Sequence, residues 1–200
     1  MTRSKTVPIK IRAIRKTDWP HITELFGNNG ACGGCWCMFW RHNPKNGSWN
    51  DVKGDKNKRR LKSILTGGEL TGALAFAGKE PVGWCSYGPK TVFPYFSRSR
   101  NYRFDIEENI WAVTCFFIKR GYRQSGIGTA MLKFAVDSAR QRKVKALQGF
   151  PTTTSKRPGR QPDAFVWTGT PALFEACGFK ALKLKGVPAP VYQRKFRYSV

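Results

Sequence analysis

Short stretches of alternating apolar and polar residues predict a β-sheet. Residues 9–14 (IKIRAI) alternate apolar and basic side chains, and residues 70–77 and 81–87 are strand-like runs joined by a Gly-Lys-Glu turn, which predicts a hairpin. The run 110–118 (IWAVTCFFI) is almost wholly apolar, as is typical of a strand that is covered on both faces in the middle of a sheet. Further strands are expected at residues 144–149, 180–185 and 190–198.

Helical spacing of apolar residues predicts about four helices between these strands. The first begins after Thr17 or Asp18 as its cap, and the second covers residues 54–65 and ends at a Gly-Gly pair. The longest helix, at 128–142, joins the apolar strand to the next one, so these two strands are expected to be parallel, with a right-handed crossover. A fourth helix lies near 170–177. Two segments lack a clear period and are expected to be irregular, namely 27–50 and 88–109.

Length and composition favour one folded domain. A chain of 200 residues suits a single domain, and a hydrophobic share of 40% excludes a disordered basic tail. No window approaches the ~18 apolar residues of a membrane span, and the N-terminus lacks the apolar core of a secretory signal. We therefore expect a soluble, cytoplasmic protein, a monomer or a homodimer, whose six cysteines are reduced.

The charge of the chain is strongly positive. Lys and Arg number 36 against 12 Asp and Glu, which gives a formal net charge of +24. Such a field attracts phosphates, anionic surfaces and acidic ligands. Basic residues are spread along the whole chain, so a generally basic surface and a dedicated nucleic-acid site both stay open. The loop 92–104, which mixes arginines with aromatic residues, suits an anionic or nucleic-acid ligand.

A glycine-rich turn follows the apolar strand. The residues RQSGIG at 123–128 stand at the mouth of the longest predicted helix. A helix N-terminus leaves several backbone N–H groups without intrahelical partners, and these groups bind phosphate. The spacing matches neither a P-loop nor a Rossmann turn. The alternative is that the glycines merely permit a tight turn from strand to helix.

This turn resembles the signature of the GNAT superfamily of acyl-CoA-dependent N-acyltransferases, Arg/Gln-x-x-Gly-x-Gly/Ala after a central strand. The order of the other elements is also similar to that family. The resemblance implies an α+β (mixed α/β) GNAT fold, with a twisted, mostly antiparallel sheet of about seven strands and a V-shaped splay between the central strands. It makes residues 1–200 one domain, with an acceptor-side region at 27–68 and a CoA-binding core at 110–150. The motifs CWCMFWR (35–41) and PVGWCSYGP (81–89) look like a bacterial subgroup with no established substrate.

The resemblance implies an acetyl-CoA-dependent N-acetyltransferase that acts on a primary amine of a small molecule by direct attack in a ternary complex, without a metal. The backbone N–H of Phe116 would stabilise the oxyanion. Alternatives are an acceptor or donor linked to RNA, such as an aminoacyl-tRNA, or a non-catalytic module that binds acyl-CoA or nucleic acid. The residues expected at the coenzyme are Phe116, Phe117, Ile118, Arg123, Gln124, Ser125, Gly126, Ile127, Gly128 and Thr129.

The acid and the base of the reaction depart from the family pattern. The strand carries Ala112, Val113 and Thr114 where many relatives have a carboxylate, and Phe174 stands where many have a tyrosine. For the acid, the candidates are Cys115, Tyr122, Tyr87 and water. Alternatively, the thiolate of CoA leaves without a proton donor. For the base, the candidates are Asp105, Glu107, Glu108, Asp163 and Glu175.

Cysteines and aromatic residues gather in the region between the first two helices. Cys32, Cys35 and Cys37, followed by His42, allow zinc binding, simple packing or an acyl-cysteine at Cys35 or Cys37. The nearby aromatic residues either form a small core under a loop or contact a flat or cationic amine. The residues expected at the acceptor are Trp36, Phe39, Trp40, Arg41 and Tyr87.

Overall fold

The computed structural model describes residues 8–106, 109–152, 166–184 and 190–198. The described residues form seven strands, which are β1 (Ile9–Ala13), β2 (Gly72–Ala77), β3 (Glu80–Pro89), β4 (Ile110–Ile118), β5 (Ala146–Gly149), β6 (Lys180–Leu182) and β7 (Val191–Lys195). They also form six α-helices, which are α1 (Trp19–Phe26), α2 (Trp49–Val52), α3 (Asp55–Gly67), α4 (Pro94–Arg98), α5 (Ile127–Gln141) and α6 (Pro171–Glu175). Three short 3₁₀ helices are η1 (Pro44–Asn46), η2 (Lys90–Val92) and η3 (Arg120–Tyr122). None of the helices in these described ranges has the length and apolar character needed to span a membrane.

The strands form one sheet in the order β1-β2-β3-β4-β5-β7-β6. Every neighbouring pair is antiparallel except β4 and β5, which run parallel and are joined through α5. The predicted mixed and mostly antiparallel sheet of seven strands is therefore confirmed. The parallel pair is the one for which the sequence predicted a crossover helix.

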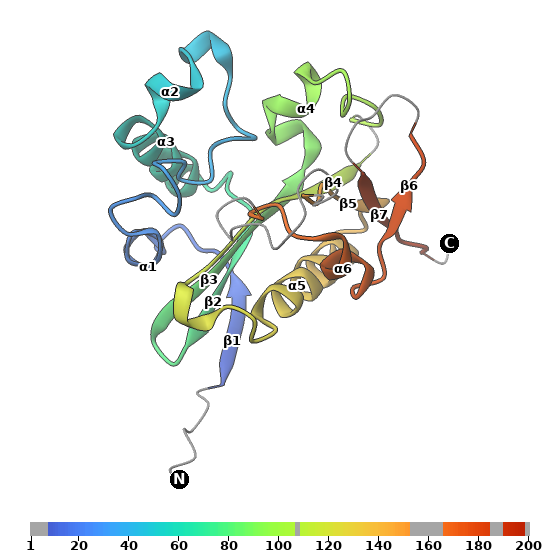
Figure 1. The fold of residues 1–200 in the computed structure, drawn as a ribbon. Coiled ribbons are helices and arrows are strands. Elements are labelled where there is room, and N and C mark those ends of the chain that lie inside the picture. The colour runs from blue at the N-terminus through green and yellow to red at the C-terminus, as the bar shows by residue number, and fades with distance from the viewer. Residues whose placement is uncertain (1–7, 107–108, 153–165, 185–189, 199–200) are drawn as a thin grey trace, which may run out of the picture.

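Helices cover both faces of the sheet (Figure 1). On one face, α5 and α6 pack on the central strands, and this core includes Leu132 from α5 and Phe174 from α6. On the other face, α1 and α3 bury Ile22 and Leu61 against Trp84 of β3. A third, mainly aromatic cluster gathers around α4. The sheet is therefore the middle layer of three, as the apolar run of β4 predicted.

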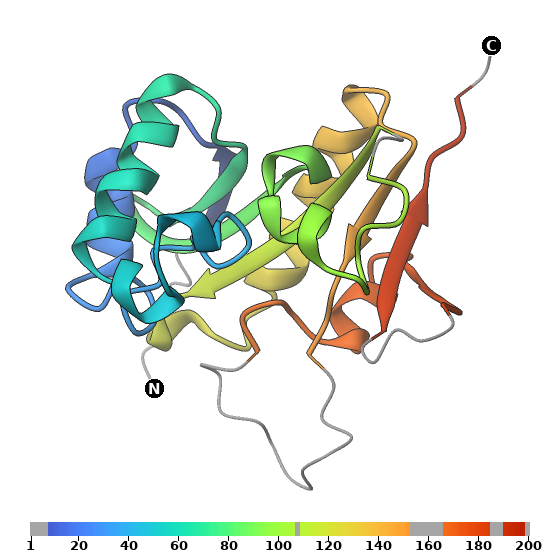
Figure 2. The same cartoon turned by 90° about the horizontal axis from the view of Figure 1, so that it is seen from above.

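The central strands separate at a defined residue. A register shift opposite Ser86 and Tyr87 leaves Thr114 as the extra residue of a bulge in β4. Pairing of β4 with β5 ends at Val113 and Gly149, whereas β4 continues to Ile118. Beyond this pairing, β4 and the chain that leaves β5 run in diverging directions (Figure 2). The second half of β4 is therefore open on the side that faced β5, which is the splay that the family resemblance implied.

Two local predictions differ from the structure. The sequence predicted about four helices, and the described residues form six, because α2 and α4 are single turns within segments that have no apolar period. Asp18 stands at the N-cap of α1 but makes no capping bond with its side chain. Its carboxylate instead accepts hydrogen bonds from Arg12 at 2.6 and 2.7 Å and from the Arg15 backbone N–H at 2.8 Å. Asp18 thus ties β1 to the start of α1.

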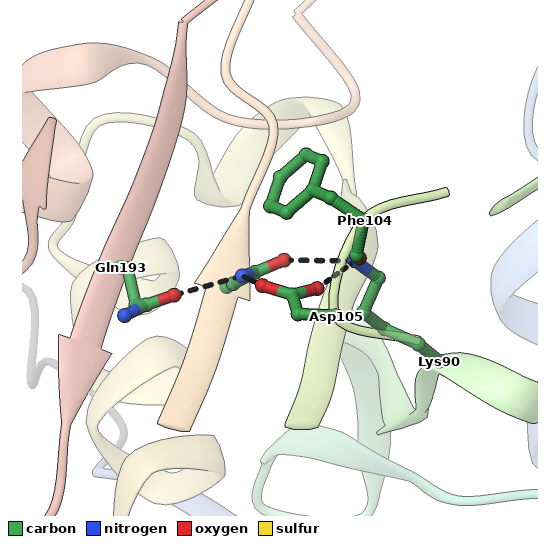
Figure 3. A network of polar contacts seen from close by, with 5 residues as sticks. Lys90, Phe104, Asp105 and Gln193 are labelled. Carbon is green, nitrogen blue, oxygen red and sulfur yellow. Dashed lines mark hydrogen bonds and ion pairs between the residues drawn. The ribbon is translucent and has the colours of Figure 1, made fainter. Parts of the chain in front are cut away.

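A buried lysine is fully satisfied by its neighbours (Figure 3). The Lys90 side chain has no exposed area, and its Nζ donates to the Phe104 carbonyl at 2.8 Å, to Asp105 Oδ1 at 2.6 Å and to Gln148 Oε1 at 3.2 Å. The Gln148 amide donates in turn to Asp105 Oδ2 at 2.7 Å and to Gln193 Oε1 at 2.8 Å. This network joins the loop before β4 to β5 and β7, and it occupies the carboxylate of Asp105, one of the candidate bases.

Candidate active site

A pocket of about 460 Å³ lies where β4 has separated from β5. Its walls are the second half of β4, the glycine-rich turn, residues 166–173, and the Ala31–Cys32 corner of the long loop after α1. Ser125 was expected at the coenzyme but does not line the pocket, and its hydroxyl donates to the Tyr122 carbonyl at 2.6 Å. The other nine residues expected at the coenzyme all line it, namely Phe116, Phe117, Ile118, Arg123, Gln124, Gly126, Ile127, Gly128 and Thr129.

The turn presents the N-terminus of α5 to this pocket. Gly126 is the N-cap with φ of +80°, a conformation that favours glycine, and no side chain caps the helix there. The first intrahelical bond runs from the Ala130 N–H to the Gly126 carbonyl at 3.0 Å. The N–H groups of Ile127, Gly128 and Thr129 therefore have no intrahelical acceptor, and the dipole of a helix of 15 residues adds partial positive charge. Backbone N–H groups of this kind are suited to bind an anion.

Two further contacts shape the turn. Arg123 Nε donates to the Ile118 carbonyl at 2.9 Å, which fixes the turn against the end of β4. A Cβ added to Gly128 would meet only Ile118 at 3.6 Å and Leu173 at 3.8 Å, which are ordinary contact distances. The protein itself therefore has room for a side chain at residue 128. Without a Cβ, residue 128 has no side chain that could cover the adjacent backbone N–H groups.

The backbone N–H of Phe116 already has an acceptor. It donates to the Trp167 carbonyl at 2.6 Å, whereas the family resemblance implied that it would face a thioester. The reason is the buried, open edge of β4, whose N–H groups require acceptors once β5 has ended. Residues 166–169 lie beside that edge and are held by a bond from the Thr152 N–H to the Gly169 carbonyl at 3.0 Å. In the structure this donor is therefore occupied, and its role toward an oxyanion stays a prediction.

Comparisons with known proteins agree with this geometry. The model of the "Acetyltransferase (GNAT) family" matches residues 36–158, more than half of the chain. The chain belongs to the GNAT family. This membership places it among the N-acetyltransferases and confirms the resemblance that the turn at 123–128 carries. A search of curated proteins found no match.

Solved GNAT structures share the fold of the whole chain. Ribosomal-protein-alanine N-acetyltransferase from Brucella melitensis is 19% identical with a TM-score of 0.53, over 94% of this chain and 99% of that one. PaiA N-acetyltransferase from Thermoplasma acidophilum, in complex with coenzyme A, is 14% identical with a TM-score of 0.54, over 94% and 99%. Aminoglycoside acetyltransferase AAC(6')-Ib, also in complex with coenzyme A, is 14% identical with a TM-score of 0.54, over 94% and 95%. At these identities the likeness establishes the fold alone.

The expected acids and bases that lie within the described residues are not part of the pocket lining. The Tyr122 hydroxyl donates to Glu80 Oε2 at 2.7 Å, and that bond raises the pKa of Tyr122. Glu175 is exposed and accepts from the Tyr192 hydroxyl at 2.8 Å. Cys115 is buried, and its hydrogen bond to Cys37 together with burial raises its pKa well above the ordinary value. Three candidate bases lie outside the described residues, namely Glu107, Glu108 and Asp163.

The residues expected at the acceptor do not line the pocket either. Trp36 is buried and stacks on Trp19 with ring centroids 5.8 Å apart, and Trp40 is buried in the aromatic cluster around α4. Tyr87 is buried in the core between the sheet and α5. Phe39 is half-buried and packs on other aromatic rings. In this state these side chains form the small core that was the alternative interpretation.

The three clustered cysteines have different surroundings. Cys32 is exposed and lines the pocket, whereas Cys35 is half-buried and burial raises its pKa to about 11. Cys37 is buried; burial raises its pKa, but hydrogen bonds from Cys115 and from Trp84 Nε1, the latter at 3.2 Å, lower it overall. Within the described ranges, no three His, Cys, Asp or Glu side chains are placed to share a metal ion.

Sequence analysis missed the wall of the pocket that residues 166–173 form. Trp167 gives no local signal, because its role depends on a backbone bond to a residue far away in the sequence. The Thr-Pro pair at 170–171 is a usable signal for the start of α6, since Thr170 Oγ1 accepts from the Leu173 N–H at 3.2 Å. That helix presents Leu173 to the pocket.

Proposed function

We propose that this GNAT protein transfers the acetyl group of acetyl-CoA to a primary amine of a small molecule by direct attack in a ternary complex. The observation that carries the proposal is the pocket of about 460 Å³ between the open edge of β4 and the uncapped N-terminus of α5. An anionic head and an extended arm are what these two walls would bind. Two similar structures contain coenzyme A, which is such a molecule.

In this proposal the diphosphate of CoA accepts hydrogen bonds from the N–H groups of Ile127, Gly128 and Thr129. Arg123, from the same lining, adds positive charge beside it. The pantetheine arm extends along β4 past Phe117 and Ile118 and uses backbone groups as an added strand would.

The acyl group then reaches the Phe116 N–H. Because the Trp167 carbonyl occupies that donor at 2.6 Å, the thioester oxygen has to replace it. The donor next stabilises the negative charge that develops on this oxygen when the amine attacks. The described lining contains no aspartate or glutamate, so we assign most of the acceleration to proximity and to this donor. The CoA thiolate is the leaving group, and the proton of the amine passes to water.

The test is the release of CoA thiol from acetyl-CoA in the presence of a panel of amines. The proposal predicts acceptor-dependent release together with an N-acetylated product whose mass is higher by one acetyl group. Binding of acetyl-CoA without acceptor-dependent release from any amine would favour the non-catalytic alternative. Failure to bind acetyl-CoA would contradict both.

The charge favours one further candidate, an acceptor linked to RNA. A net charge of +24 on 200 residues attracts phosphate backbones strongly. Affinity for tRNA should then fall steeply with salt, because released counterions drive such binding. A salt dependence that is flat would exclude this acceptor class.

A further inference from the structure

One buried arginine lacks acceptors for most of its donors. Arg41 is only 4% exposed, and its Nη1 donates to the Val92 carbonyl at 3.2 Å. Its guanidinium carbon lies 4.4 Å from the centre of the Phe93 ring, which covers one face of the group. The atoms Nε and Nη2 are buried as well, and no described residue accepts a hydrogen bond from either. The buried Nε1 of Trp40 next to it also has no acceptor among the described residues.

Lys90 is a second buried cation in the same protein, and its hydrogen-bond acceptors can be compared with those of Arg41. Both cations flank one pair of rings: Arg41 lies over Phe93, Lys90 lies 5.2 Å from the centre of Phe96, and the two ring centroids are 6.0 Å apart. Lys90 has three acceptors, including the carboxylate of Asp105 (Figure 3). Among the described residues, Arg41 has one acceptor for its five N–H groups. A buried charge without a partner is costly, so a fold retains one where something else supplies the partner.

The shape of the unpaired region identifies the missing partner. Nε and Nη2 form one edge of the guanidinium plane, and this edge presents two parallel N–H groups. A carboxylate or a phosphate fits such an edge with two oxygens. Burial lowers the pKa of Arg41 to about 10, which leaves it charged at neutral pH.

Arg41 also belongs to the region that borders the reaction site. Its neighbour Trp40 lies 6.2 Å from Trp167, centroid to centroid, and the carbonyl of Trp167 holds the Phe116 N–H. Trp167 therefore connects this aromatic cluster to the donor that the thioester would use. Since solvent does not reach Nε or Nη2 in the present state, an anion reaches them only when neighbouring side chains shift.

We propose that Arg41 binds an anionic oxygen group of the acceptor, so that the substrate is an amine that also carries a carboxylate or a phosphate. This inference rests on the proposed acetyl transfer and specifies its acceptor. It differs from the flat or cationic amine that the aromatic residues alone suggested.

The experiment compares three amines of similar size, namely β-alanine, O-phosphoethanolamine and β-alaninamide. With acetyl-CoA, kcat/KM for one of the anionic amines should exceed that for the amide by about 30- to 100-fold, because a charge-assisted bidentate contact is lost with the amide. The variant R41M should remove this preference, and R41K, which keeps the charge but not the two parallel donors, should reduce it. The anionic amine with the higher kcat/KM shows whether Arg41 binds a carboxylate or a phosphate. Equal rates with the acid and the amide in the unmodified protein would overturn the inference.

A second readout needs no turnover. At constant ionic strength and without acetyl-CoA, the preferred anionic amine should raise the unfolding temperature of the unmodified protein but not that of R41M. Such binding without acetyl transfer would contradict the proposed function while it supports the Arg41 site. The absence of any shift with either anion would overturn the site.

The unfolding temperatures of two variants show whether Arg41 binds a ligand or stabilises the fold. R41M removes an unpaired buried charge and should leave the unfolding temperature unchanged or raise it. K90M is the matched control; it removes the cation that pairs with the half-buried Asp105, which then keeps, among the described residues, only the hydrogen bond from Gln148, and should lower the unfolding temperature by several degrees. A loss in R41M as large as that in K90M would show that Arg41 is structural.

Discussion

A substitution at Gly128 tests whether the N-terminus of α5 binds the coenzyme without lowering the stability of that helix. The substitution Gly128→Ala places a methyl group 3.6 Å from Ile118 and 3.8 Å from Leu173, which the protein accommodates without a shift. Alanine is favoured over glycine in a helix by up to about 1 kcal/mol, so the variant should be at least as stable as the parent. The same methyl group lies on the surface where the diphosphate would approach the N–H groups. Loss of one charge-assisted hydrogen bond costs about 1.5–3 kcal/mol, which is a decrease in affinity of about 10- to 150-fold.

Calorimetric titration with acetyl-CoA measures the affinity, and denaturant unfolding measures the stability. Gly121→Ala is the matched control, because a Cβ there has no neighbour within 4 Å and the residue does not line the pocket. The control should bind acetyl-CoA as the unmodified protein does. If Gly128→Ala also bound acetyl-CoA with unchanged affinity, the diphosphate would not lie on this turn.

Three other outcomes are expected. Burial raises the pKa of Asp18, but the hydrogen bonds from Arg12 and the backbone lower it overall, so the ion pair stabilises the protein above about pH 4 and this stabilisation is lost as the pH falls through the lower folded pKa. Asp18→Asn should therefore lower the free energy of unfolding, measured with denaturant near neutral pH, by about 1–3 kcal/mol. A loss of the same size in strong acid would contradict the ion pair. Acetyl-CoA should change the tryptophan fluorescence of the unmodified protein and not that of Trp167→Phe, and equal changes in both would argue against displacement of Trp167. Acetyl-CoA should also slow alkylation of the exposed, pocket-lining Cys32, which peptide mass spectrometry detects, and unchanged labelling would place the ligand elsewhere.

Local patterns predicted the scaffold well, for physical reasons. A strand that is buried on both faces must be apolar throughout, and β4 is. A turn that exposes helix N–H groups needs glycine, and Gly126 adopts a φ that favours glycine. Residues 123–129 are contiguous and follow β4 directly, so the order of the elements predicted a turn at the N-terminus of a helix there, and the family resemblance implied that this turn contacts the coenzyme.

Contacts between distant segments could not be predicted in this way. The bond from Phe116 to Trp167 joins the open edge of β4 to a segment with no periodic pattern. Aromatic residues in an irregular loop have the same composition whether they pack together or face a ligand. Trp36 and Trp40 accordingly proved to be part of the buried core. The proposed role of Arg41 could be inferred only once the structure showed that its buried Nε and Nη2 lack acceptors among the described residues.

The most direct measurement is a ¹H–¹⁵N spectrum of the protein during titration with coenzyme A. If the diphosphate accepts hydrogen bonds from the first turn of α5, the amide signals of Gly128 and Thr129 should show the largest shifts, while that of Gly121 stays in place. Saturation with the coenzyme that left the signals of Gly128 and Thr129 unmoved, while others shifted, would contradict the account.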